Sequence, residues 1–284
     1  MADLDLRPLS LGEILDRTFS LYRNNFLLFV GIAAIPQLLV LALHLATTIL
    51  PFVAQNSPVR ALTSGNAVAF LVVTALVGVV VYIVAYLFAQ GGTVFAVSEL
   101  YLGRKTSIMG SMKLMRGHAL VLLGVVILSS IAIGLATLLL IIPGIWLACR
   151  FIVCAPAALL EDLGPGDSLS RSFQMTQDNA GRSFVIYLLY FVLIYAATFC
   201  LTFPFTIAAG MSARNPSAAR MWLITSHFGE FLGTVLVTPI LTIATAVYYY
   251  DLRVRLEAFD LQMMLNSLGG APREASPSAP SSAS

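Results

Sequence analysis

Long unbroken runs of apolar residues are the feature that most constrains this chain. A transmembrane helix needs about 20 apolar residues to cross a hydrocarbon core of ~30 Å. Five runs reach this length, and a shorter one follows the third run after Pro143 and Gly144, a pair typical of a tight turn. The six runs cover residues 26–50, 67–89, 119–142, 145–160, 183–209 and 231–250. The sequence therefore predicts an all-α integral membrane protein with six transmembrane helices.

The composition excludes two large classes of protein. Of the 284 residues, 58% are hydrophobic and only 11% are charged, against roughly 25% charged in soluble domains. A soluble enzyme with this composition would expose large apolar patches to water. The net charge of +2 is too small for the basic surface that binds nucleic acid. We therefore expect membrane lipids as partners, with a protein at the cytoplasmic face as a further option, and no nucleic acid.

The distribution of basic residues predicts the orientation. Short cytoplasmic loops of membrane proteins are enriched in Lys and Arg. Twelve basic residues lie on the side of the N-terminus, and only Arg60, Arg214 and Arg220 lie on the other side. The twelve are Arg7, Arg17, Arg23, Arg104, Lys105, Lys113, Arg116, Arg171, Arg182, Arg253, Arg255 and Arg273. Both termini are thus predicted to be cytoplasmic.

A short amphipathic segment precedes the first, third and fifth runs, which predicts three pseudo-repeats. Residues 10–13 form a capping box that begins the first segment, whose apolar residues fall on one helical face. A shift of 154 residues aligns five identical residues of the first and third segments. These are Gly12, Leu15, Arg17, Phe19 and Asn25, aligned with Gly166, Leu169, Arg171, Phe173 and Asn179. Each unit is predicted to be one interfacial amphipathic helix followed by a two-helix hairpin.

Two stretches of the sequence stand apart from this scheme. Apolar residues continue from 67 to 102, which fits either one long helix or a transmembrane helix joined to an interfacial one at Gly91 and Gly92. Residues 1–266 are predicted to form the membrane domain, and residues 267–284 are rich in Ser, Pro, Ala and Gly. Such a composition predicts a disordered cytoplasmic tail.

Three motifs together resemble one bacterial family. They are Arg-Pro-Leu-Ser-Leu-Gly-Glu-Ile-Leu-Asp at 7–16, Ile-Pro-Gly-Ile-Trp-Leu at 142–147 and Tyr-Tyr-Asp-Leu-Arg-Val-Arg at 249–255. The set resembles membrane domains of the glycerophosphoryl diester phosphodiesterase type, over roughly residues 6–266. The resemblance implies a bacterial inner-membrane protein. The phosphodiesterase domain fused to some relatives would need about 250 further soluble residues, so the activity in the family's name is not expected here.

Arg150 is the most informative single residue. A charged residue within a transmembrane helix costs at least ~2.5 kcal/mol on insertion scales, so it should face the protein interior and find a partner. Glu99 is the predicted ion-pair partner, and the ring of Trp146, one turn earlier, is a predicted cation–π contact. Arg150 then either binds a lipid phosphate or another anion, or belongs to a structural pair.

Arg17 and Arg171 occupy matching places in the predicted interfacial helices. Paired arginines at a cytoplasmic interface attract anionic lipid headgroups. However, Glu13 and Asp167 each lie four residues earlier, the favourable orientation for a helical ion pair. A structural role therefore competes with lipid binding at both residues.

The sequence shows no catalytic arrangement, and we expect neither an enzyme nor a cofactor or metal. Gly164-Pro165-Gly166-Asp167 and Tyr250-Asp251 match elements of intramembrane aspartyl proteases, but in the reverse order and at helix ends. His44, His118 and His227 are interpreted as scattered by topology. No His-Glu-x-x-His, Gly-x-Ser-x-Gly or phosphate-binding glycine loop occurs.

Two functions remain open from the sequence. The first is a non-enzymatic membrane protein that organises or assists a process at the cytoplasmic face, such as envelope lipid metabolism. The alternative is a transporter or lipid-handling protein with an anionic-ligand site at Arg150. A cavity at Arg150 favours the second, whereas a sealed ion pair favours the first.

Overall fold

The computed structural model describes residues 8–54, 67–177 and 179–257, and these residues form helices without a strand. The helices are α1 (Leu11–Asn24), α2 (Phe26–Ala54), α4 (Ala67–Tyr101), α5 (Ile108–Leu139), α6 (Ile141–Arg150), α7 (Cys154–Leu160), α8 (Pro165–Met175), α9 (Ala180–Leu201), α10 (Phe203–Met211) and α11 (Pro216–Glu257). The predicted tail, 267–284, lies outside the described residues.

The six predicted membrane-spanning segments are confirmed in number and kind. Each is helical, long enough and apolar enough to cross a membrane: Phe26–Ile49, Val72–Tyr101, Ile108–Leu139, Ile141–Leu160, Ala180–Met211 and Pro216–Leu256. The chain therefore has an all-α, membrane-type fold.

The structure settles several boundaries that the apolar runs left open or placed elsewhere. α4 is one helix of 35 residues that continues through Gly91 and Gly92. The fourth segment is interrupted between α6 and α7, and the fifth between α9 and α10, where Pro204 follows the break. α11 has 42 residues, about 63 Å at 1.5 Å per residue, and extends beyond the predicted run at both ends.

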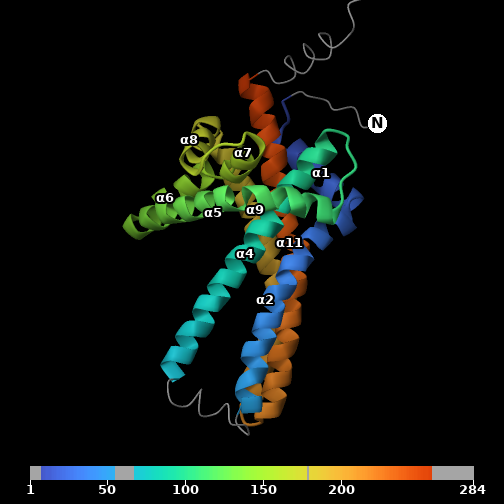
Figure 1. Ribbon diagram of the computed structural model, residues 1–284, viewed down its shortest axis with the longest axis vertical. Helices are drawn as coiled ribbons and strands as arrows, with labels where there is room; N and C mark the ends of the chain where they lie inside the picture. Colours follow the sequence, from blue (N-terminus) through green and yellow to red (C-terminus); the bar gives the residue numbers. More distant parts are fainter. Residues whose placement is uncertain (1–7, 55–66, 178, 258–284) are drawn as a thin grey trace, which may run out of the picture.

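The long helices spread from one end of the molecule. In Figure 1, α2 and α11 lie side by side along the long axis, and α4 diverges from them. The α5–α6 hairpin extends to one side of these helices. Its tip is apolar and exposed, from Leu138 (84% exposed) to Ile142 (79%), as expected of a surface that contacts lipid rather than water.

The two amphipathic helices form for recognisable local reasons. Ser10 caps α1 by accepting from the Glu13 amide, and the Glu13 carboxylate accepts from the Ser10 amide, which is the predicted capping box. α8 begins with Pro165 in its first turn, where proline is favoured.

Tyr22 attaches α1 to a neighbouring helix. Burial raises the pKa of the Tyr22 phenol on α1, and its hydroxyl donates to the Leu236 carbonyl at 2.8 Å. α1 is thereby attached to α11.

The middle unit of the predicted repeat differs from the other two. α1 and α8 are separate helices before α2 and α9, as expected. The amphipathic stretch before the third run, in contrast, is the first part of α5, which is continuous from Ile108 to Leu139. A threefold repeat therefore remains a prediction, with a separate interfacial helix in two of its three units.

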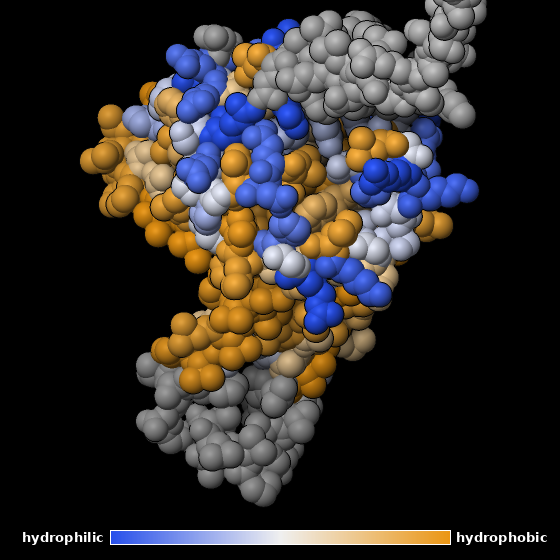
Figure 2. All heavy atoms as spheres, turned by 45° about the horizontal axis from the view of Figure 1, so that its top comes forward, coloured by the Kyte–Doolittle hydropathy of each residue, from blue (hydrophilic) through white to orange (hydrophobic). Residues whose placement is uncertain are grey.

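Close helix crossing explains why α4 carries a glycine pair. A Cβ on Gly91 would collide with the side chain of Met115 on α5, and a Cβ on Gly92 would approach Ile32 on α2 to 2.9 Å. The core of the molecule lies at this level, between α1, α2, α4, α5, α7 and α11. Hydrophilic side chains gather over the end that carries α1 and α8, and apolar side chains cover much of the remaining described surface in Figure 2.

Candidate functional site

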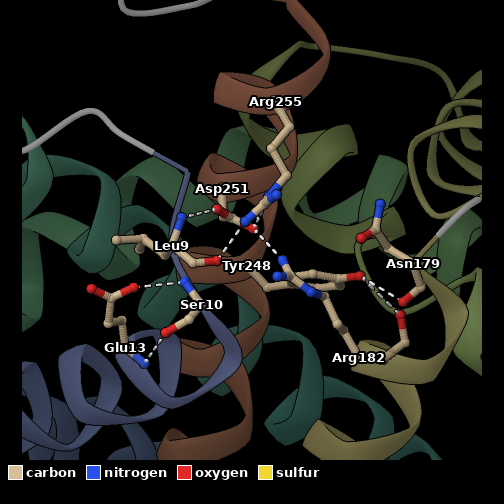
Figure 3. A network of polar contacts seen from close by, with 9 residues as sticks. Leu9, Ser10, Glu13, Asn179, Arg182, Tyr248, Asp251 and Arg255 are labelled. Carbon is tan, nitrogen blue, oxygen red and sulfur yellow. Dashed lines mark hydrogen bonds and ion pairs between the residues drawn. The ribbon is translucent and has the colours of Figure 1, made fainter.

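A cluster of charged residues joins the helices at the end that carries α1. Its centre is Asp251 on α11, whose side chain is fully buried. The carboxylate pairs with Arg182 of α9 (3.1 Å) and Arg255 (2.9 Å), and it accepts from the Leu9 amide (2.6 Å). Arg255 also donates to the Leu9 carbonyl at 2.6 Å. Figure 3 shows these groups converging from three separate parts of the chain.

Three consecutive tyrosines, residues 248–250, extend this cluster. We call the whole cluster the α11 hub, and it comprises Leu9, Arg182, residues 248–251 and Arg255. The Tyr248 hydroxyl donates to the Asn179 carbonyl at 3.0 Å. The Tyr249 hydroxyl donates to Glu161, the C-cap residue of α7, at 2.7 Å. Tyr250 donates to Ser98 at 3.0 Å and stacks on Tyr101 at 4.7 Å between ring centroids. α11 is therefore bound through this one motif to α4, α7 and α9.

The α11 hub shows why Asp251 is not a protease aspartate. A catalytic carboxylate pair shares a proton and must reach substrate. The Asp251 carboxylate is instead surrounded by two guanidinium groups and one amide. A carboxylate with these partners is the centre of a cluster of ion pairs, so its role is structural.

Arg150 lies at the interruption between α6 and α7, and it is only 6% exposed. Its carbonyl, left without a helical partner, accepts from the hydroxyls of Ser172 (2.8 Å) and Thr176 (3.0 Å) on α8. Its guanidinium lies over the rings of Trp146 (5.2 Å) and Phe173 (4.2 Å). The predicted contact with Trp146 is therefore confirmed, and Arg150 lies beside the amphipathic helix α8.

The predicted ion pair between Arg150 and Glu99 is wrong. Glu99 pairs with Arg104 at 3.6 Å, because the turn after α4 brings that guanidinium back toward it. Among the described residues, Nε and Nη1 of Arg150 are buried and have no hydrogen-bond partner. Arg150 is thus a buried cation supported by aromatic rings, with two nitrogens whose N–H groups have no acceptor among the described residues.

Arg17 and Arg171 are both occupied by contacts within the protein. Arg17 contacts Tyr101 on α4, with the hydroxyl 3.4 Å from Nη1 and the ring centroid 5.7 Å from Cζ. Arg171 pairs with Glu161 on α7 at 3.1 Å. Sequence spacing pointed to Glu13 and Asp167 on their own helices, whereas these partners lie on neighbouring helices. The structural interpretation is favoured at both positions.

An apolar cavity lies against α6, the helix that ends at Arg150, although Arg150 itself does not line it. It has a volume of about 350 Å³ and lies between α5, α6 and α9. Ile145, Ala148 and Cys149 of α6 line it, together with Phe184 and Phe191 of α9. Trp146 and Arg150 lie on the adjoining stripe of α6, so a cation and an apolar cavity are neighbours on one short helix.

The histidines are not scattered as the sequence suggested. His44 on α2 and His227 on α11 lie 5.1 Å apart between ring centroids, and Glu230 lies beside both. His118 is separate and pairs with Asp162 at 3.0 Å. The expectation failed because α11 begins at Pro216, so that His227 lies on a helix next to α2 and not in a loop.

Sequence reasoning missed the α11 hub and the Glu161 contacts, although signals for both were present. The Tyr-Tyr-Asp-Leu-Arg-Val-Arg motif was singled out for resemblance only, and Arg182 was counted only as a cytoplasmic charge. A buried Asp needs partners, which could have directed attention to these arginines.

Comparison of the chain with family models, with curated proteins and with solved structures found no match to it.

Proposed function

We propose that the protein is a lipid-handling membrane protein that binds an anionic headgroup at Arg150. The observation that carries the proposal is the buried guanidinium, in which two nitrogens have no hydrogen-bond partner among the described residues. An unpaired buried charge costs several kcal/mol, which an anionic ligand would offset. A guanidinium also matches phosphate geometry with parallel N–H donors. A phosphate is therefore the ligand chemistry that suits Arg150.

The neighbouring cavity supports a lipid over a free phosphate. The apolar cavity of about 350 Å³ is lined by α6 residues that directly precede Arg150. An acyl chain in this cavity would place its headgroup toward the polar stripe formed by Trp146 and Arg150. The half-exposed Trp146 ring suits the boundary between headgroup and hydrocarbon.

The setting of this site follows from the expected topology. The excess of basic residues on one side supports a cytoplasmic position for α8 and the neighbouring Arg150. The family resemblance supports a bacterial inner membrane. The resemblance to membrane domains of the glycerophosphoryl diester phosphodiesterase type is consistent with envelope lipid metabolism. In this proposal the chain binds or positions lipid and catalyses no reaction.

The test is native mass spectrometry of the purified protein with lipids retained from the host membrane. Arg150→Leu is expected to fold and to lose anionic phospholipid, and Arg150→Lys is expected to retain part of it. Arg104→Leu is the matched control, because Arg104 is exposed (66% of its side chain) and pairs with a carboxylate. Unchanged lipid in a folded Arg150→Leu variant would refute the proposal.

A second candidate is the organising role at the cytoplasmic face. It is favoured by the gathering of hydrophilic side chains over the end that carries α1 and α8. A protein partner bound at this surface would be lost on changing exposed residues such as Arg23 and Asp16. Lipid retention would be unaffected by those changes, which separates the two roles.

A further inference from the structure

A second polar cluster lies far along α2 and α11 from the α11 hub, and it comprises His44, His227 and Glu230. One ligand atom from each residue lies within 4.8 Å of the others. Nδ1 of His44 is 3.4 Å from Oε2 of Glu230, and Nδ1 of His227 is 3.8 Å from the same oxygen. Two imidazole nitrogens and one carboxylate oxygen therefore converge.

The hydrogen bonds around Thr48 determine which atom of His227 faces this point. The Thr48 hydroxyl has one proton, and it donates that proton to the His44 carbonyl at 2.8 Å. With that proton used, the same oxygen is able to accept from Nε2 of His227 at 3.1 Å, in the tautomer whose Nε2 carries the hydrogen. In the neutral ring of that tautomer, Nδ1 keeps its lone pair.

The resulting arrangement is unfavourable without a cation. The lone pair of His227 Nδ1 faces a carboxylate oxygen, and both groups are electron-rich. A histidine whose second nitrogen donates to an oxygen is the arrangement that orients metal ligands in proteins. The Thr48 hydroxyl provides this support here.

We propose that His44, His227 and Glu230 bind a divalent transition-metal ion of the zinc class. Tetrahedral ligands about 2.1 Å from zinc lie about 3.4 Å from one another, which matches the His44–Glu230 distance. The His227 distance of 3.8 Å requires a shift of a few tenths of an ångström. Two imidazoles and one carboxylate suit zinc better than calcium or magnesium, which prefer oxygen ligands.

The surroundings leave room for a further ligand on the ion. His44 and Glu230 line a cavity of about 410 Å³ between α2, α4, α9 and α11. Gln37, Tyr82, Tyr86 and Tyr190 also line this cavity. Three protein ligands fill three positions of a tetrahedral ion, so a water or a small anion can take the fourth. Bound metal would also tie α2 to α11.

Zinc binding to the purified, tag-free and chelator-treated protein tests the proposal, by calorimetry and by the visible absorption of bound Co²⁺. Wild-type protein is expected to bind one ion per chain and to unfold at a higher temperature with zinc. His44→Leu, His227→Leu and Glu230→Gln should each abolish the Co²⁺ spectrum. Thr48→Val should lower zinc affinity roughly 10–100-fold, the usual effect of losing a supporting contact.

Two controls make the outcome decisive. His118→Leu removes a histidine that pairs with Asp162 elsewhere and should leave zinc binding unchanged, as should Arg150→Leu. Glu230 is nearly half exposed, so Glu230→Gln decides the question if a histidine variant fails to fold. Absence of zinc binding in the wild type, or binding that survives Glu230→Gln and either histidine change, overturns the proposal.

Discussion

The α11 hub and the Arg150 site both bury charge, but they do so in opposite ways. In the hub, the Asp251 carboxylate has two guanidinium partners and a backbone amide. Arg150 is almost as buried, yet Nε and Nη1 have no partner among the described residues. The Asp251 charge is satisfied within the protein, whereas the Arg150 guanidinium is the group for which we propose an anionic ligand. The contrast separates a structural cluster from the proposed binding site.

The largest expected effect is that of removing the centre of the hub. Asp251→Ala leaves Arg182 and Arg255 without their carboxylate and the Leu9 amide without its acceptor. Breaking a buried ion pair from one side costs about 3–5 kcal/mol. Equilibrium unfolding in mixed detergent micelles should show a loss of this size. Asp162→Ala is the control, because Asp162 is 80% exposed, and an equal loss there would contradict the comparison.

A smaller loss is expected at the edge of the hub. Tyr249→Phe removes the hydroxyl that donates to Glu161 at 2.7 Å and keeps the ring. A hydrogen bond to a charged group contributes about 1.5–3 kcal/mol. The same unfolding measurement tests this, with Tyr195→Phe, whose side chain is largely exposed, as the matched control. A change within error would mean that Glu161 is satisfied by Arg171 alone.

Loss of the α1 cap should have a still smaller effect. Ser10→Ala removes the side-chain acceptor for the Glu13 amide, which typically costs ~1 kcal/mol. Ser10→Gly should lower the free energy of unfolding by only a few tenths of a kcal/mol. If both variants destabilise the protein equally, the Ser10 hydroxyl does not act as the cap.

Arg150→Leu should have the least effect on stability, and this sharpens the comparison most. The change removes a buried charge that has no carboxylate partner, so the free energy of unfolding of delipidated protein should stay the same or rise. Bound anionic lipid, measured by native mass spectrometry, should fall at the same time. A loss of stability as large as that of Asp251→Ala would make Arg150 a structural residue like those of the hub.

The sequence was sufficient for the features that depend on local pattern. Apolar runs predicted six membrane-spanning helices, and Ser10 with Glu13 predicted a capping box that the structure confirms. Trp146 was identified as a contact of Arg150 because the two lie one helical turn apart. These properties depend on neighbours within a few residues, so the sequence alone determines them.

Contacts between distant segments were decided only by the tertiary structure. Arg171 pairs with Glu161, and Arg17 contacts Tyr101 on α4. His44 and His227 meet only because α2 packs beside α11. Helical periodicity fixes which face of a helix is apolar but not which helix covers it or at what height. The partner of each buried charge is therefore set by helix packing. The same packing gives Asp251 of the α11 hub its ion-pair partners and leaves Nε and Nη1 of Arg150 without a hydrogen-bond partner among the described residues.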